Sequence, residues 1–175
     1  VSLDVIESQA MLAAARKYKR VVQVGFQRRS TPHLIEAREL IKQGLLGTVG
    51  HAEIFYYGLA QPTVLHPEPT PETLDWDMWI GPAPMRPYSP EVYKDWRSFK
   101  EFGNGSIGDL GIHMFDLVRW LLDLRWPKRI SSFGGIQVLK TGAANISDDQ
   151  TAMFDFDNLT VVWQHRRFGR QPDPD

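Results

Sequence analysis

The end of the chain carries two short apolar-rich segments, residues 150–156 and 159–165, that are joined only by Asp157 and Asn158. Asp and Asn over so short a connection are typical of a tight turn, so we expect the two segments to be strands of a hairpin. A third strand is expected over residues 130–138. This part of the chain must therefore contribute to a sheet with antiparallel neighbours.

The segments before this hairpin predict helices and strands in alternation, as follows. Residues 2–17 repeat apolar positions at helical spacing, with Ser2 as the expected cap, and the β-branched run 21–27 predicts a buried strand. Ser30 or Thr31 should begin a second helix, which Gly44 and Gly47 end, and a strand is expected over 49–57. The order predicts an α+β fold, in which an open, mainly antiparallel β-sheet has its helices packed on one face.

Residues 58–100 form a long connection that is rich in Pro and Trp. Its aromatic residues are spaced like anchors that pack on something, which is not typical of a low-complexity linker.

Composition excludes several classes of function. The chain has 175 residues, which fits one domain, and its net charge of −1 gives no sign of nucleic-acid or membrane partners. It has no cysteine, so disulfides and thiolate metal sites are excluded. The sequence does not begin with Met and stops directly after an expected strand, so we expect a piece of a longer protein.

The stretch EFGNGSIGD contains the spacing G-x-G-x-x-G in Gly103, Gly105 and Gly108. A dinucleotide loop of this kind follows a buried strand and has an acidic residue about 20 positions later. The preceding residues are charged, and the later position falls near Lys128 and Arg129. We therefore interpret the glycines as a turn that leads into a helix.

That helix is expected over residues 106–123, with Ser106 and Asp109 as a capping box. Asp109, His113 and Asp116 fall on one narrow stripe beside the apolar face. A histidine between two carboxylates can exchange a proton near neutral pH. Spacing alone fits an active site and a salt-bridged helix flank equally well.

Other candidates depend on single observations. Arg28 and Arg29 follow an expected strand and could hold an anion or sugar hydroxyls, or be surface charge. His165 could line a pocket or face solvent. A metal site would need Asp109 and His113 together with further ligands such as Asp116 and His165.

Several segments together resemble the glucose–fructose oxidoreductase, inositol dehydrogenase and rhizopine-catabolism (Gfo/Idh/MocA) family of dehydrogenases. The segments that carry the resemblance are VVQVGFQRRSTPHLIEARELIKQGLLGTVGHAEIFYY, DWDMWIGPAPMRPYSPEVY, DWRSFKEFGNGSIGDLGIHMFDLVRWLL and WPKRI. The resemblance covers residues 1–175 as the family's C-terminal, substrate-binding and oligomerisation domain. It implies that the family's N-terminal Rossmann domain is absent from this chain.

The resemblance also implies roles for residues. His113 matches the family's catalytic acid/base and Asp109 its active-site partner, whereas Arg28 or Arg29 matches a substrate-side position. Together with these arginines, Asp116, Trp96 and His165 complete the set of expected substrate-binding residues.

The same family implies NAD or NADP in the full-length protein, and we expect this chain to bind no cofactor alone. The expected substrate is a sugar or polyol, the expected assembly is a homo-oligomer through the open sheet, and the expected compartment is the cytoplasm.

Two other readings stay open at this level. A stand-alone hydrolase or lyase could use the Asp109, His113 and Asp116 stripe without nicotinamide. A carbohydrate-binding module could instead use Trp76, Trp79 and Trp96 of the Trp-rich region.

Overall fold

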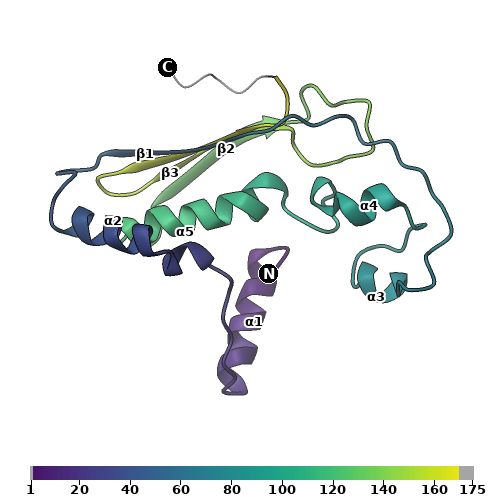
Figure 1. Cartoon of the computed structure of the whole chain (residues 1–175), viewed down its shortest axis with the longest axis horizontal. Helices are drawn as coiled ribbons and strands as arrows, with labels where there is room; N and C mark the ends of the chain where they lie inside the picture. Colours follow the sequence, from purple (N-terminus) through teal and green to yellow (C-terminus); the bar gives the residue numbers. More distant parts are fainter. Residues whose placement is uncertain (1, 170–175) are drawn as a thin grey trace.

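A single four-stranded sheet organises the chain in the computed structural model, which describes residues 2–169 (Figure 1). Its strands are β1 (His51–Tyr57), β2 (Arg129–Gly135), β3 (Asp149–Asp155) and β4 (Thr160–Arg166). The spatial order is β1-β4-β3-β2, and only β1 and β4 pair in parallel. The predicted α+β class is confirmed, and the one parallel pair makes the sheet mixed.

The predicted hairpin is present as β3 and β4. Asp155 lies opposite Thr160, and Phe156 N–H donates to the carbonyl of Leu159 at 2.9 Å around the turn. β1 can lie parallel to β4 because more than a hundred residues separate them, which allows a long crossover.

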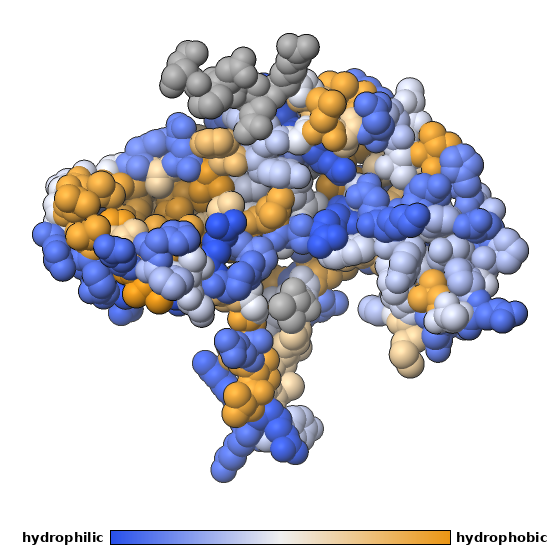
Figure 2. Space-filling model, in the orientation of Figure 1, coloured by the Kyte–Doolittle hydropathy of each residue, from blue (hydrophilic) through white to orange (hydrophobic). Residues whose placement is uncertain are grey.

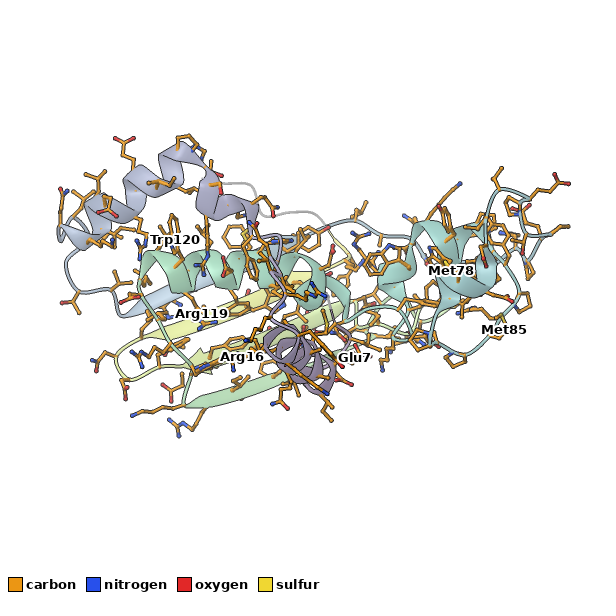
Figure 3. The ribbon with its side chains drawn as sticks, turned by 90° about the horizontal axis from the view of Figure 1, so that it is seen from below. Glu7, Arg16, Met78, Met85, Arg119 and Trp120 are labelled. Carbon is orange, nitrogen blue, oxygen red and sulfur yellow. The ribbon has the colours of Figure 1, made fainter. Side chains whose placement is uncertain are left out.

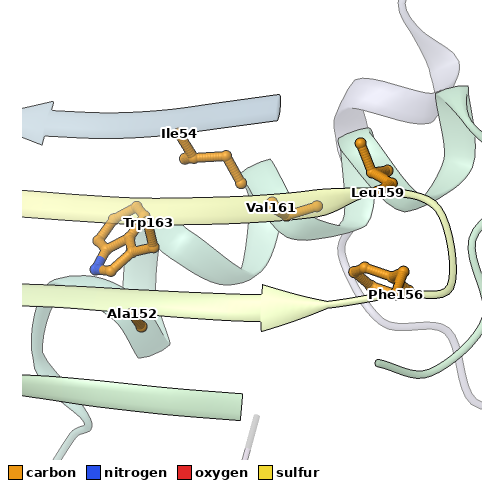
Figure 4. Close-up of a cluster of buried hydrophobic side chains, with 6 residues drawn as sticks. All are labelled: Ile54, Ala152, Phe156, Leu159, Val161 and Trp163. Atoms are coloured by element: carbon orange, nitrogen blue, oxygen red, sulfur yellow. The ribbon is translucent and has the colours of Figure 1, made fainter. Parts of the chain in front are cut away.

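Two helices, α2 (Pro32–Lys42) and α5 (Ile112–Leu121), lie on one side of the sheet (Figure 1). Ile54, Trp163 and Ala152 are opposite one another on β1, β4 and β3, so their side chains share one face. Figure 4 shows this core, in which the Trp163 side chain is 0% exposed. Across residues 2–169, every helix is too short or too polar to span a membrane.

The connection 58–100 forms a small core of its own. It contains α3 (Trp76–Ile80) and α4 (Pro90–Lys94), and the Trp76 and Trp79 rings stack 4.6 Å apart. Trp76 also donates to the carbonyl of Arg86 at 2.8 Å. This lobe extends beyond the sheet, with Met78 and Met85 exposed on it (Figure 3). The predicted aromatic anchors therefore pack chiefly on one another.

Residues 2–26 have almost no packing against the sheet, and we call them the arm. Its helix α1 (Val5–Lys17) projects away from the sheet and has no buried residue (Figure 1). Asp4, and not the expected Ser2, caps α1, because its side chain accepts the Glu7 N–H at 2.8 Å.

The predicted buried strand over residues 21–27 is wrong. The segment is extended but belongs to no sheet, Val21 is 101% exposed, and Gln27 already begins a 3₁₀ helix (Gln27–Ser30). A β-branched run becomes a buried strand only when a neighbouring strand pairs with it, and no strand within residues 2–169 does so. Apolar side chains are visible on the projecting arm in Figure 2.

Candidate functional site

A cavity of about 500 Å³ lies where the arm meets the rest of the molecule. The arm supplies one wall, the 96–105 segment supplies another, and the first turns of the α5 region supply the floor. The lining residues used below are Phe26, Trp96, Arg97, Asn104, Asp109 and His113.

His113 stands on the first turn of α5 and lines the cavity. Its Nδ1 atom is buried and has no hydrogen-bond partner within residues 2–169, so Nε2 is the nitrogen that solvent can reach. The ring meets Phe26 of the arm edge to face, with centroids 6.2 Å apart. The imidazole is therefore held with its Nδ1 edge against the protein and its Nε2 edge toward the cavity.

Asp109 lies in a π-helix, Ile107–Gly111, that leads directly into α5. Helix geometry already holds at Ser106, whose side chain makes no cap hydrogen bond, so the predicted capping box is wrong. The wider turn also changes the angular spacing that predicted a single acidic stripe. Asp109 forms an ion pair with Arg97 at 2.6 Å and no hydrogen bond with His113.

The three glycines before this helix are explained by packing. Gly105 has φ +67°, and a Cβ there would lie 2.5 Å from Ile146 Cγ2. A Cβ on Gly108 would lie 2.5 Å from Asn104, and one on Gly103 would lie 3.1 Å from the indole of Trp96. No strand precedes the loop, so it lacks the geometry of a dinucleotide site.

Arg29 and Asp116 were expected at the substrate, and the structure pairs them with each other. Arg29 Nε and Nη2 donate to the two carboxylate oxygens of Asp116 at 2.7 and 2.6 Å. Asp116 is buried, and neither residue lines the cavity. Their ion pair ties the 3₁₀ helix after the arm to α5. Arg28, in the same 3₁₀ helix, also lies outside the cavity lining.

His165 lies on the inner face of β4 and is only 1% exposed. Its Nε2 is 3.2 Å from the carbonyl of Ser147, and burial lowers the pKa of the imidazole. It does not line the cavity with His113. Burial of this kind suits a residue of the sheet core.

Trp96 does line the cavity, but Arg97 lies over its ring at 4.2 Å. Trp76 is buried in the lobe core, and Trp79 stacks against it. The three tryptophans therefore do not form one sugar-binding platform.

Within residues 2–169, no three side chains of the His, Asp and Glu types are grouped closely enough to hold a metal ion.

Sequence reasoning missed two residues of the cavity, Arg97 and Asn104. Arg97 pairs with Asp109 across twelve positions of sequence, and Asn104 Nδ2 donates to the carbonyl of Leu3 in the arm. No periodic pattern links such positions. The adjacent Trp-Arg pair, six positions before the first glycine of the loop, is the sequence signal that could have pointed to Arg97.

Comparison with known proteins agrees with this architecture. The chain is 27% identical over 115 residues to the rhizopine catabolism protein MocA of Rhizobium meliloti, covering 66% of this chain and 26% of that protein. The solved aldose–aldose oxidoreductase of Caulobacter crescentus has a similar fold, with a TM-score of 0.67 at 20% identity over 95% of this chain and 41% of that one.

The WlbA dehydrogenase of Bordetella pertussis, solved with NADH and UDP-GlcNAcA, gives a TM-score of 0.66 at 15% identity over 96% of this chain and 42% of that one. The chain thus spans about a quarter of the length of MocA and about two fifths of these solved proteins. Residues 35–132, more than half of the chain, match the model of an oxidoreductase family's C-terminal alpha/beta domain. The chain belongs to this oxidoreductase family, and its matched region is the family's C-terminal domain.

Proposed function

We propose that this chain supplies the substrate side of a sugar or polyol oxidoreductase site. The observation that carries the proposal is the cavity in which His113 and Asp109 are placed together beside Arg97. A cavity with both polar and apolar lining residues and a solvent-reachable imidazole fits a small polyhydroxylated substrate.

In this site His113 is the acid/base. Its Nε2 would accept the proton of a substrate hydroxyl as the carbon beneath loses hydride, and would return the proton in the reverse direction. Asp109, in the π-helical turn that leads into α5, would hold a neighbouring part of the substrate. Phe26 of the arm contacts the imidazole edge to face on the other side of the cavity.

A nicotinamide, NAD or NADP, supplies the hydride acceptor in such a reaction. The glycine loop of this chain does not fit a dinucleotide, because its glycines pack on Trp96, Asn104 and Ile146. We therefore propose that the described residues provide only the substrate side of the reaction.

The arm supports contact with a further domain. Apolar residues of α1, including Ile6 at 72% and Leu12 at 50% exposed, share the arm with the unpaired β-branched segment that contains Val21 and Val22. An apolar helix followed by an extended β-branched run is typical of a parallel α/β sheet buried on both faces. The proposal places a nucleotide-binding domain of that type against the arm, beside the cavity.

Steady-state NADH formation tests the function, in a protein that joins this chain to a nucleotide-binding domain of the family. We expect turnover with at least one cyclic polyol or aldose, and a loss of about 100-fold or more in kcat for His113→Asn. An Arg86→Gln variant, outside the cavity, is the control. Full activity in His113→Asn, or no turnover with any polyol or aldose tried, would contradict the proposal.

The outer face of the sheet supports self-association, which we also propose. Phe55 and Phe133 lie in one register row on this face and are 59% and 68% exposed, and Met153 lies in the next row. Gln164 and Thr151 lie between the two phenylalanines in this row, and an uncovered sheet face that exposes large apolar side chains favours a protein contact. Light scattering should show a dimer or larger assembly that Phe133→Lys dissociates, whereas a wild-type monomer at high concentration would refute it.

The geometry gives less support to the other two readings. Asp109 and Asp116 are each held by an arginine and neither bonds His113, so the stripe lacks the linked groups of a hydrolase triad. Trp76 is a core residue and Trp96 is covered by Arg97, so a binding module through these tryptophans lacks a free ring face.

A further inference from the structure

We propose that Asn104 is a site of spontaneous deamidation, and that this modification releases the arm from the loop before α5. The inference goes beyond the proposed function, because it concerns a chemical change of the chain itself and needs no substrate or cofactor. It starts from the glycine loop EFGNGSIGD, in which Asn104 stands directly before Gly105.

The reaction requires only this asparagine, the glycine after it and water. The backbone nitrogen of Gly105 loses its proton to hydroxide and attacks Asn104 Cγ, the Cγ–Nδ2 bond breaks, and the side-chain nitrogen takes a proton from water and leaves as ammonia. Water then opens the five-membered succinimide at either carbonyl, which gives aspartate or isoaspartate. Nothing is oxidised or reduced. Glycine favours the attack because it has no Cβ to hinder the approach of its nitrogen.

The structure leaves the two reacting groups open to this chemistry. Asn104 is exposed, and both Asn104 and the more buried Gly105 line the cavity of about 500 Å³, so solvent in the cavity meets both residues. Gly105 begins the helical stretch that leads into the π-helix, and its N–H donates to no group within residues 2–169. The nitrogen therefore has no hydrogen bond to break before it loses its proton.

The chain contains two further asparagines, and both lack this combination. Asn145 precedes the β-branched Ile146, and its Oδ1 accepts the Lys100 N–H at 2.7 Å. Asn158 is exposed at the hairpin turn, but it precedes Leu159, whose side chain is packed in the sheet core and 6% exposed. These two asparagines are therefore controls within the same molecule.

The Asn104 side chain also ties the arm to the rest of the molecule. Its Nδ2 donates to the carbonyl of Leu3, and within residues 2–169 this is the only hydrogen bond that joins residues 2–26 to residues 31–169. The side chain packs over Gly108, where an added Cβ would lie 2.5 Å from Asn104 Cβ. Because α1 buries no residue, this hydrogen bond carries a large share of the arm's attachment.

Deamidation removes that hydrogen bond. The product carboxylate has only acceptors at neutral pH, and the Leu3 carbonyl that it would face is an acceptor too. Isoaspartate also lengthens the main chain of the loop by one carbon, which displaces the side chain from its place over Gly108. Both products therefore detach the arm from the loop.

Peptide mass spectrometry on the whole 175-residue chain, aged at pH 9 and at pH 7, tests the chemistry. We expect the amide of Asn104 to become a carboxylate about ten-fold or more faster than the amides of Asn145 and Asn158. The reaction should be faster at pH 9, because hydroxide removes the Gly105 proton, and isoaspartate should be among the products. Asn104→Gln should abolish it, since glutamine must close a larger ring. Similar rates at the three asparagines, or an unchanged Asn104 at pH 9, would overturn the assignment.

Limited trypsin cleavage after Arg20 measures the release of the arm. Asn104→Asp carries the charge of the product, and Asn158→Asp adds the same charge at the hairpin turn as the matched control. We expect cleavage about three-fold or more faster in Asn104→Asp than in wild type, and unchanged in Asn158→Asp. Aged and fresh wild type provide the same comparison without a variant, and thermal unfolding separates local release from a less stable chain. Equal cleavage of Asn104→Asp and wild type would overturn the release of the arm.

Discussion

The arm and the rest of the molecule contain the same kinds of apolar residue, but the arm exposes them to solvent and the sheet buries them. On the sheet, Val161 and Trp163 are 1% and 0% exposed, whereas on the arm Val21 and Ile6 are 101% and 72% exposed. Both regions are regular, with a capped helix in the arm and ladders in the sheet. The difference is the facing layer, which α5 supplies to the sheet and nothing within residues 2–169 supplies to α1.

The comparison teaches where the candidate site gets its geometry. His113 and Asp109 stand on the buried-core side, on a helix that packs against Trp163. The opposite wall, with Phe26, belongs to the arm. One wall of the cavity is therefore as stable as the fold, and the other depends on what covers the arm.

The largest expected effect comes from removing a large side chain from the core of the sheet, and it is compared with the same kind of change on the arm. Trp163→Ala should lower the free energy of unfolding by about 3–5 kcal/mol, because it empties a fully buried site. Leu12→Ala on α1 should change it by less than about 0.5 kcal/mol, since that side chain is half exposed. Urea unfolding followed by circular dichroism measures both. Similar losses for the two variants would erase the distinction between the regions.

A second test uses carboxylates. Burial raises the pKa of Asp148, but the N–H groups of Leu139, Gln137 and Val138 lower it more, so its pKa lies below the ordinary value. A carboxyl with a depressed folded-state pKa stabilises the fold above its unfolded pKa of about 3.9, and this contribution is lost as the pH falls.

Asp148→Asn should therefore cost about 2 kcal/mol at pH 7 and progressively less below about pH 4. Asp4→Asn on the arm keeps a good helix cap and should change stability little at either pH. Urea titrations at pH 7 and pH 3 compare them, and a penalty for Asp148→Asn that stays constant with pH would exclude the ionic explanation.

The smallest expected effect comes from a comparison of two glycines, one in the loop before α5 and one on the arm. Gly105→Ala should destabilise by about 1–2 kcal/mol from its positive φ alone, with the contact to Ile146 adding to this. Gly25 on the arm has no atom within 4 Å of an added Cβ, so Gly25→Ala should stay within about 0.5 kcal/mol. Thermal melts of both variants provide the comparison. A neutral Gly105→Ala would show that the loop is not fixed as described.

Regular local patterns made most of the structure outside the arm predictable. The hairpin around Asp157 and Asn158, and the helices beginning near Thr31 and Ser106, all follow from turn residues and apolar periodicity. The prediction of a buried strand over residues 21–27 was wrong, because a β-branched run indicates a preference for a sheet but does not indicate whether a neighbouring strand is present.

The site was predictable only in part. The resemblance to known dehydrogenases pointed to Asp109 and His113, and the structure places both on one cavity. The π-helix at Ile107–Gly111 has no signature in apolar spacing, so the partners of the acidic residues could not be read from the sequence. Asp116 pairs with Arg29 and Asp109 pairs with Arg97, and each pair joins residues that are distant in the sequence.

Amide hydrogen exchange on the whole chain tests most directly whether the arm is less stably packed than the helix that carries His113. Because α1 buries no residue and α5 packs on the sheet core, amides of Val5–Lys17 should exchange about 100-fold faster than those of Ile112–Leu121. Equal protection of the two helices would contradict the division between the arm and the rest of the molecule, on which the proposed site depends.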